Sequence, residues 1–114
     1  MTKTNSGKHD ATIDILIERL EKNEYHQISK QVNYYNPGCQ DIAGEIDVMA
    51  FKTDGPKSNL LLFEIKTYDR PTNYKKAVEQ LDRSASHYEK FADKIYKFYV
   101  TTSIEDGLNI RRVK

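Results

Sequence analysis

The chain has 114 residues, with 18 lysines and arginines against 17 aspartates and glutamates and a formal net charge of +1. This length fits one compact domain and leaves little room for a second, and the near-neutral balance gives no global basic signature. No apolar run approaches the ~20 residues that span a bilayer, and the single Cys39 excludes an internal disulfide, so a cytoplasmic protein without membrane contact is expected. Residues 1–8 lack the apolar stretch of a signal peptide and predict a flexible leader, with one domain over residues 9–114.

The first half of the chain is predicted to form a helix followed by three strands. Apolar residues at helical spacing predict a helix over residues 10–23, and residues 26–34 have the alternation of a strand. Residues 45–52 and 60–67 predict two more strands, joined by a turn over residues 54–59. These two strands are expected to form a β-hairpin.

The second half is predicted to contain the longest helix and a last strand. Residues 72–92 carry an apolar stripe directly behind Pro71, which suits the start of a helix. Residues 95–101 predict a final strand, and the pattern after them is ambiguous. The order α-β-β-β-α-β allows a crossover connection, so we expect an α/β fold with a mixed four-stranded sheet flanked by helices.

Two of the predicted strands carry charge inside apolar, β-branched runs. Glu45 and Asp47 interrupt the first of them, and Glu64 and Lys66 the second. An unpaired charge is expensive to bury, so these charges indicate a function or a solvated surface. In the simpler interpretation they form a ladder of ion pairs on a sheet face that is open to water.

The expected hairpin geometry brings these charges near one another. A turn near residue 56 places Asp47 opposite Ile65, with Glu64 and Lys66 as its diagonal neighbours. Because side chains alternate between faces, Glu64 and Lys66 share one face. The charges gather if the two polar faces coincide, and a register slip of one residue would change this outcome.

Two carboxylates and a lysine in this arrangement suit metal-assisted phosphate chemistry. Mg²⁺ takes oxygen ligands and is commonly held by one or two carboxylates, water and substrate phosphate, a role that Asp47 and Glu64 fit. The backbone carbonyl of Ile65 could add a further oxygen. Lys66 would then position or deprotonate the attacking water, or neutralise charge on the phosphate.

At this point the chain resembles the PD-(D/E)xK, or restriction-endonuclease-like, nuclease superfamily. Asp47, sixteen intervening residues and then Glu64, Ile65 and Lys66 match the pattern, and the predicted element order is that of the superfamily core. The resemblance covers about residues 10–101. The two segments around Asp47 and Glu64 are similar to those of small archaeal Holliday-junction resolvases and of resolvase-like bacterial proteins. Ile46 stands where the superfamily name has proline, at a variable position that is not catalytic.

The resemblance implies roles for individual residues. Asp47 and Glu64 would be metal ligands together with the Ile65 carbonyl, and Lys66 would be the catalytic lysine. The superfamily often adds an acidic residue from the first helix and a glutamine from the helix after the motif. Asp14, Asp10 and Glu18 are the candidates for that acid, and Gln80 for that glutamine.

Nucleic-acid contacts are expected beside the motif. Residues 1–65 carry 7 basic against 10 acidic side chains and residues 66–114 carry 11 against 7, so the basic half follows the motif. Arg70, Lys75 and Lys76 could hold a phosphate backbone, although plain solvation explains them equally well. Tyr35 and its neighbour Tyr34 could stack on bases, or pack on the core.

The remaining ionisable groups give no second motif. The three histidines, His9, His26 and His87, have no metal-ligand spacing and are expected at the surface or partly buried. His9, at the start of the first helix, could approach the site.

The sequence therefore predicts a metal-dependent endonuclease that hydrolyses phosphodiester bonds in DNA with Mg²⁺ or Mn²⁺. By analogy with the resolvases, the substrate is expected to be branched or otherwise structured DNA, and cutting two strands would need a homodimer. The alternative is a catalytically inactive nucleic-acid-binding or protein-interaction module on the same fold.

Overall fold

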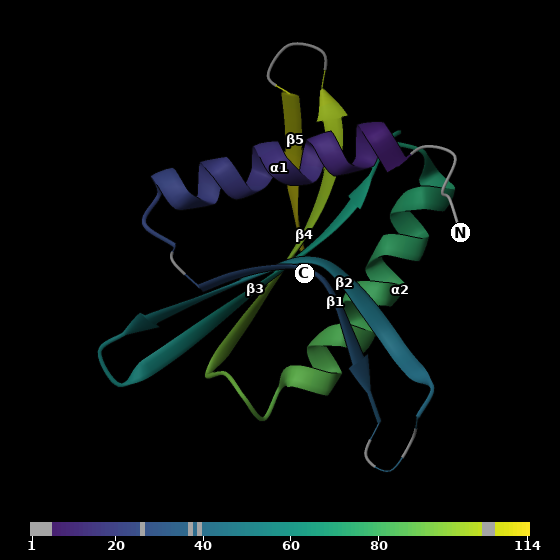
Figure 1. Cartoon of the computed structure of the whole chain (residues 1–114). Coiled ribbons are helices and arrows are strands. Elements are labelled where there is room, and N and C mark those ends of the chain that lie inside the picture. The colour runs from purple at the N-terminus through teal and green to yellow at the C-terminus, as the bar shows by residue number, and fades with distance from the viewer. Residues whose placement is uncertain (1–5, 26, 37, 39, 104–106) are drawn as a thin grey trace.

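The computed structural model describes residues 6–25, 27–36, 38, 40–103 and 107–114, and His26 and Cys39 lie outside them. Two helices and five strands follow one another in the order α1 (Ser6–Lys22), β1 (Gln27–Tyr35), β2 (Ile42–Asp54), β3 (Lys57–Lys66), α2 (Pro71–Tyr88), β4 (Lys94–Ser103) and β5 (Gly107–Val113) (Figure 1). Within the described ranges, neither helix combines the length and apolarity that a membrane span requires. The helix predicted from residue 10 begins four residues earlier, inside the predicted leader.

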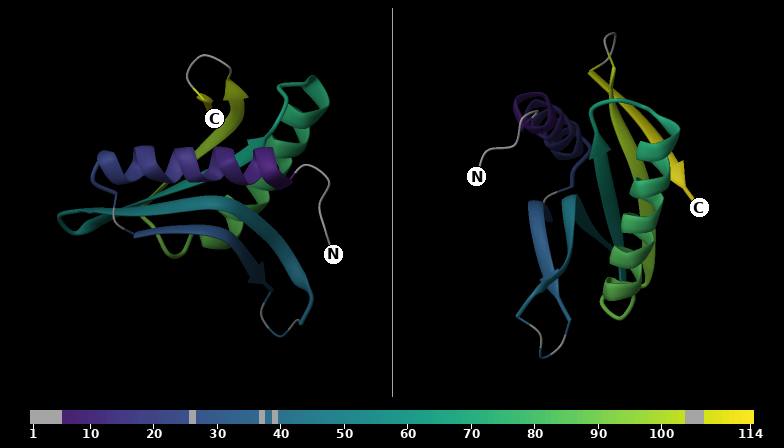
Figure 2. Two further views of the ribbon diagram at one scale, coloured as in Figure 1. Left: turned by 45° about the horizontal axis from the view of Figure 1, so that its top comes forward. Right: turned by 90° about the vertical axis from the view of Figure 1, so that its right-hand side faces the viewer.

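The strands form one mixed sheet in the order β1-β2-β3-β4-β5. Only β3 and β4 are parallel, and α2 forms the crossover between them, as the sequence predicted. The other neighbours are antiparallel. The two helices cover opposite faces of the sheet (Figure 2).

The expectation of four strands is corrected by β5, which pairs antiparallel with β4 at the edge of the sheet. Leu108 packs in the core under α1, whereas Val113 packs in the core under α2. Ile110 between them is 42% exposed. With one buried residue on each face and exposed residues between, β5 lacks the period-two pattern that reveals a strand in a sequence.

The central strand β3 is buried on both faces. Its side chains alternate, so that Leu61, Phe63 and Ile65 pack under α1 while Leu60 and Leu62 pack under α2. This strand separates the two halves of the core. A strand with both faces buried is expected to read as an apolar run, and Glu64 is the exception within it.

The β2–β3 turn has two residues, Gly55 and Pro56, between the paired residues Asp54 and Lys57. Gly55 has φ of +62°, which the first position of a type II′ hairpin turn requires. This turn is tighter than a turn centred on residue 56. The predicted register is therefore wrong by one residue, and Val48 lies opposite Phe63.

The β1–β2 hairpin changes face halfway along its length. On β2, Val48 packs under α1 but Ile46 packs under α2, although residues two apart normally share a face. On β1, Gln31 has a left-handed φ of +53°. Since Lys30 pairs with Val48 and Val32 with Ile46, this residue lies level with Asp47. Both strands therefore rotate where Asp47 is located.

The far end of the same hairpin is fastened to α2. Tyr34 is 4% exposed, and its hydroxyl forms a 3.1 Å hydrogen bond with the Ser84 hydroxyl. Its ring lies 4.3 Å from the ring of His87 and 5.8 Å from that of Tyr88, centroid to centroid. A side chain at Gly44 would overlap the Tyr34 ring, which explains the glycine. The core-packing alternative for Tyr34 is thus confirmed.

The strained backbone at Gln31 gives a first prediction. Replacing Gln31 with glycine removes the clash between Cβ and the carbonyl oxygen in the left-handed region, so we expect the free energy of unfolding to rise by about 0.5–1 kcal/mol. Asn33→Gly, at an exposed β1 position without a positive φ, should lower it by a similar amount. Urea denaturation measures both, and a loss of stability in Gln31→Gly would contradict the assignment of strain.

Candidate active site

The two carboxylates of the motif meet at the end of the β2–β3 ladder. Val48 and Phe63 are the last paired residues, so Asp47 and Glu64 are the next residues on either strand. Their exposed fractions are 5% and 4%. Directly opposite residues share a face, so the corrected register, rather than the predicted one, brings the two carboxylates together.

Asp47 holds the strand where the ladder stops. Its Oδ2 accepts a 2.8 Å hydrogen bond from the backbone N–H of Ile65, a group that would otherwise lose its partner as the strands separate. The same oxygen lies 3.5 Å from Nε2 of His9. That Nε2 is also 3.2 Å from the carbonyl oxygen of Ile65. Three elements, α1, β2 and β3, therefore converge on one point.

Lys66 lies at the rim of the pair. Its Nζ is 3.8 Å from Oε2 of Glu64, and its side chain is 28% exposed, which leaves it open to solvent. Glu45 is half-buried and adds negative charge near Glu64. The four charges of the two strands thus gather, as the sequence suggested they would if the faces coincided.

The pair is short of positive charge. Burial, followed by the negative charge of Asp47, raises the pKa of the Glu64 carboxyl to about 9, against the opposing effect of Lys66. The hydrogen-bonding contact with Asp47 raises the pKa of His9 above its ordinary value, although partial burial opposes this. A further cation beside the carboxylates would favour the ionised form of Glu64.

The first-helix acids do not reach the pair. Asp14 is 69% exposed and faces Lys30, 3.7 Å away, and Glu18 faces Lys22 at 3.3 Å. Asp10 is 57% exposed and lies 4.0 Å from Nδ1 of His9. The predicted role of Asp14 is therefore corrected, because its side of the helix turns toward β1.

His9 is the α1 residue that enters the site, and the sequence contained a signal for it. It precedes the buried Ile13 by four positions and the buried Leu16 by seven, so it continues the stripe that faces the sheet. The acidic candidates lie off that stripe. The possibility that His9 approaches the site from the start of the helix is therefore confirmed.

Other predicted residues lie on α2 and at the end of β1. From α2, the half-buried Gln80 donates a 2.8 Å hydrogen bond from Nε2 to the carbonyl oxygen of Glu45, and so braces β2 just before Asp47. Lys75 and Lys76 are exposed on α2. Tyr35 is 47% exposed and pairs with Ile42 at the far end of the β1–β2 hairpin.

The donor atoms fit a hard cation only in part. Asp47, Glu64 and the Ile65 carbonyl supply the carboxylate and carbonyl oxygens that Mg²⁺ and Mn²⁺ prefer. Among the residues the structure describes, no three His, Cys, Asp or Glu side chains stand in a metal-binding arrangement. Water and substrate phosphate would have to complete the coordination, as is common for Mg²⁺.

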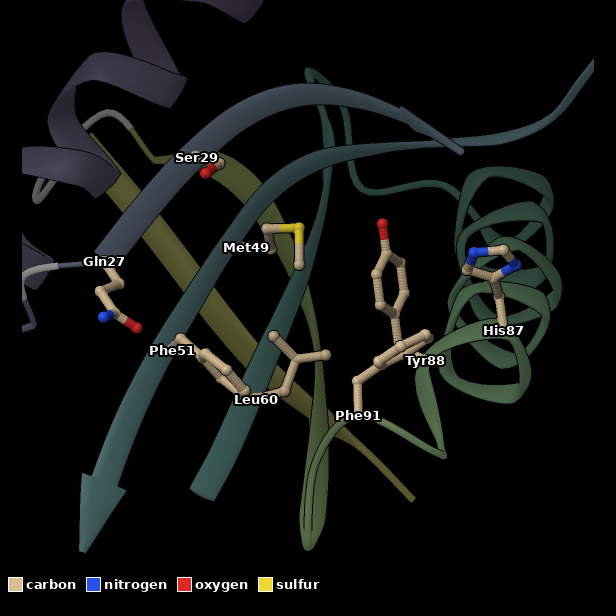
Figure 3. A pocket seen from close by; sticks show the side chains of 8 residues that line it. All are labelled: Gln27, Ser29, Met49, Phe51, Leu60, His87, Tyr88 and Phe91. Atoms are coloured by element: carbon tan, nitrogen blue, oxygen red, sulfur yellow. The ribbon is translucent and has the colours of Figure 1, made fainter. Parts of the chain in front are cut away.

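An apolar pocket is lined by other residues than these charged ones. This pocket of about 350 Å³ opens where the end of α2 faces the first three strands (Figure 3). Its walls are mainly apolar, with Phe51 and Leu60 on one side and Tyr88 and Phe91 on the other. The lining contains neither a carboxylate nor a lysine, so it lacks the charges that the motif brings together.

No known family matches the chain, and no curated protein matches it.

The shifted pKa of Glu64 predicts how stability depends on pH. Its ordinary value is 4.5 and its value in the fold about 9, so folding disfavours the ionised carboxyl. The contribution of Glu64 to stability is therefore full below pH 4.5 and falls as the pH rises toward 9. We expect Glu64→Gln to melt above the parent at pH 8.5, and the difference to vanish at pH 4.

Calorimetry in chelator across this range measures the effect. Glu79→Gln, an exposed change on α2, should shift the melting temperature little at either pH. If Glu64→Gln melted at or below the parent at pH 8.5, folding would not raise the pKa of the Glu64 carboxyl as described.

Proposed function

We propose that this protein is a metal-dependent nuclease that hydrolyses phosphodiester bonds in DNA. The observation that carries the proposal is the buried pair of Asp47 and Glu64, side by side at the end of β3, with the ammonium of Lys66 3.8 Å from the second carboxylate. The α-β-β-β-α-β succession before β5 supports a restriction-endonuclease-like core. The pattern of aspartate, glutamate and lysine supports the PD-(D/E)xK type.

Each residue has a role that follows from its position. Asp47, Glu64 and the Ile65 carbonyl would hold Mg²⁺ or Mn²⁺, which when bound acidifies water and stabilises charge on a phosphate. Lys66, open to solvent at the rim, would donate hydrogen bonds to a phosphate oxygen or to the attacking water. His9 would hold the Asp47 carboxylate in place and contribute positive charge.

The substrate is proposed to be branched DNA, and the active unit a homodimer. The described residues carry one such site, and cutting both strands of a branch needs two. Gln80, which braces β2 through Glu45, would keep Asp47 aligned while the substrate binds. Lys75 and Lys76, exposed on α2, are the proposed backbone contacts beside Arg70.

The second candidate is a DNA-binding module without turnover. His9 is the observation that favours it, because an imidazole stands 3.5 Å from Asp47 where the superfamily often has a third carboxylate. A protonated imidazole would compete with the cation for Asp47. This candidate predicts binding of the same DNA without cleavage.

Cleavage assays on supercoiled, linear, single-stranded and four-way-junction DNA test the proposal. In Mg²⁺ or Mn²⁺ the parent should cut at least one of these DNAs. Each of Asp47→Asn, Glu64→Gln and Lys66→Met should lower the cleavage rate by a factor of about 100 or more. Lys57→Met, an exposed lysine at the opposite end of β3, should keep most of the activity. A Lys66→Met variant as fast as the parent would remove the lysine from the mechanism.

Metal binding gives a separate test that does not depend on turnover. Mn²⁺ at about 100 times its dissociation constant should stabilise the parent by about 2.7 kcal/mol. The gain should disappear in Asp47→Asn and remain in Glu79→Gln. A melting temperature that Mn²⁺ raises, with no cut in any DNA, would select the binding module over the nuclease.

A further inference from the structure

An exposed tyrosine with two cations lies beside the candidate active site. Tyr68 follows Lys66 by two residues in the connection from β3 to α2, and it is 52% exposed. The Nζ of Lys8 is 5.6 Å from the centre of its ring, and the guanidinium carbon of Arg70 is 5.3 Å from it. We call Tyr68, Lys8 and Arg70 the Tyr68 patch.

Two elements place the patch next to the candidate active site, α1 and the connection from β3 to α2. Lys8 directly precedes His9, whose ring contacts Asp47, and Arg70 directly precedes the first residue of α2, with no capping hydrogen bond from its side chain. The carbonyl oxygen of Tyr68 accepts a 2.8 Å hydrogen bond from Nδ2 of Asn73, which fixes the backbone below the ring. The aromatic ring is therefore presented to solvent at a defined place near Lys66.

Folding alone does not account for this arrangement. Cation–π contacts at exposed positions contribute little to stability, and the ring is absent from both core clusters. A half-exposed aromatic ring with two cations over it has the complementary chemistry of a nucleotide, once the cations turn to the phosphates and leave a ring face to the base. The base can stack on the ring, and the phosphates on either side can take the two cations.

We propose that the Tyr68 patch binds one unpaired nucleotide of a DNA strand next to the scissile phosphate. A base inside a duplex has both faces covered by its neighbours, so only an unpaired or splayed base offers a face to Tyr68. This inference rests on the proposed nuclease function for its position on the substrate. It deepens that function by assigning preference to DNA with a single-stranded nucleotide at the cut.

Binding can be measured without turnover. The probe is a 12-nucleotide DNA strand carrying one 2-aminopurine, compared with a duplex of the same length, in chelator. The parent should bind the single strand and quench the 2-aminopurine by stacking. Tyr68→Ala should weaken single-strand binding about tenfold and abolish the quenching, while Tyr68→Phe retains both.

Two controls separate the patch from general effects. Phe91→Ala changes an exposed aromatic side chain just beyond the end of α2 and should bind like the parent. Lys8→Ala and Arg70→Ala should each reduce the slope of log affinity against log salt by about 0.7, the value for one phosphate contact with a single strand.

The outcomes distinguish this inference from the proposed function. Equal single-strand binding by Tyr68→Ala and the parent overturns the patch, as does an equal loss in Phe91→Ala or an equal loss on the duplex. If Tyr68→Ala loses single-strand binding but the parent cuts no DNA with any metal, the nuclease proposal fails and the nucleotide site stands. If both cut branched DNA equally fast, the nuclease stands and the patch falls.

Discussion

Two carboxylates buried side by side, Asp47 and Glu64, are the constraint on which the rest of the structure depends. Burial and the neighbouring Asp47 charge raise the pKa of Glu64, and the lysine at the rim offsets only part of the repulsion. An apolar pair in the same places would make a more stable sheet. Buried ionisable groups with a strongly shifted pKa are common at functional sites. A divalent cation would supply the positive charge that this pair lacks.

The two carboxylates lie where the pairing between β2 and β3 ends. The β2–β3 ladder stops after Val48, and the Asp47 side chain takes up the freed backbone N–H of Ile65. Rotation of the β1–β2 hairpin at Gln31 turns the outer half of both strands toward α2, where Tyr34 and Gln80 fasten it. Backbone strain and a broken ladder are thus concentrated at the residues with the chemistry, as is common at functional sites.

Much of this could be predicted from the sequence, because helix periodicity and the charges within apolar strands are local signals. The pairing of Asp47 with Glu64 could not be, since a two-residue turn at Gly55 and a three-residue turn look alike in sequence and differ by one in register. The entry of His9 in place of Asp14 depends on which side of α1 faces the sheet at its first turn. The strand β5 could not be predicted because it buries only Leu108 on one face and Val113 on the other, which leaves no apolar alternation in the sequence.

The central claim is that the buried pair binds a divalent cation, and a crystal grown in Mn²⁺ tests it most directly. Anomalous scattering should locate one Mn²⁺ bound by the carboxylates of Asp47 and Glu64 and by the carbonyl oxygen of Ile65, with the imidazole of His9 still beside Asp47 or displaced from it. Anomalous density only elsewhere on the molecule, with no Mn²⁺ beside the two carboxylates, would contradict the account.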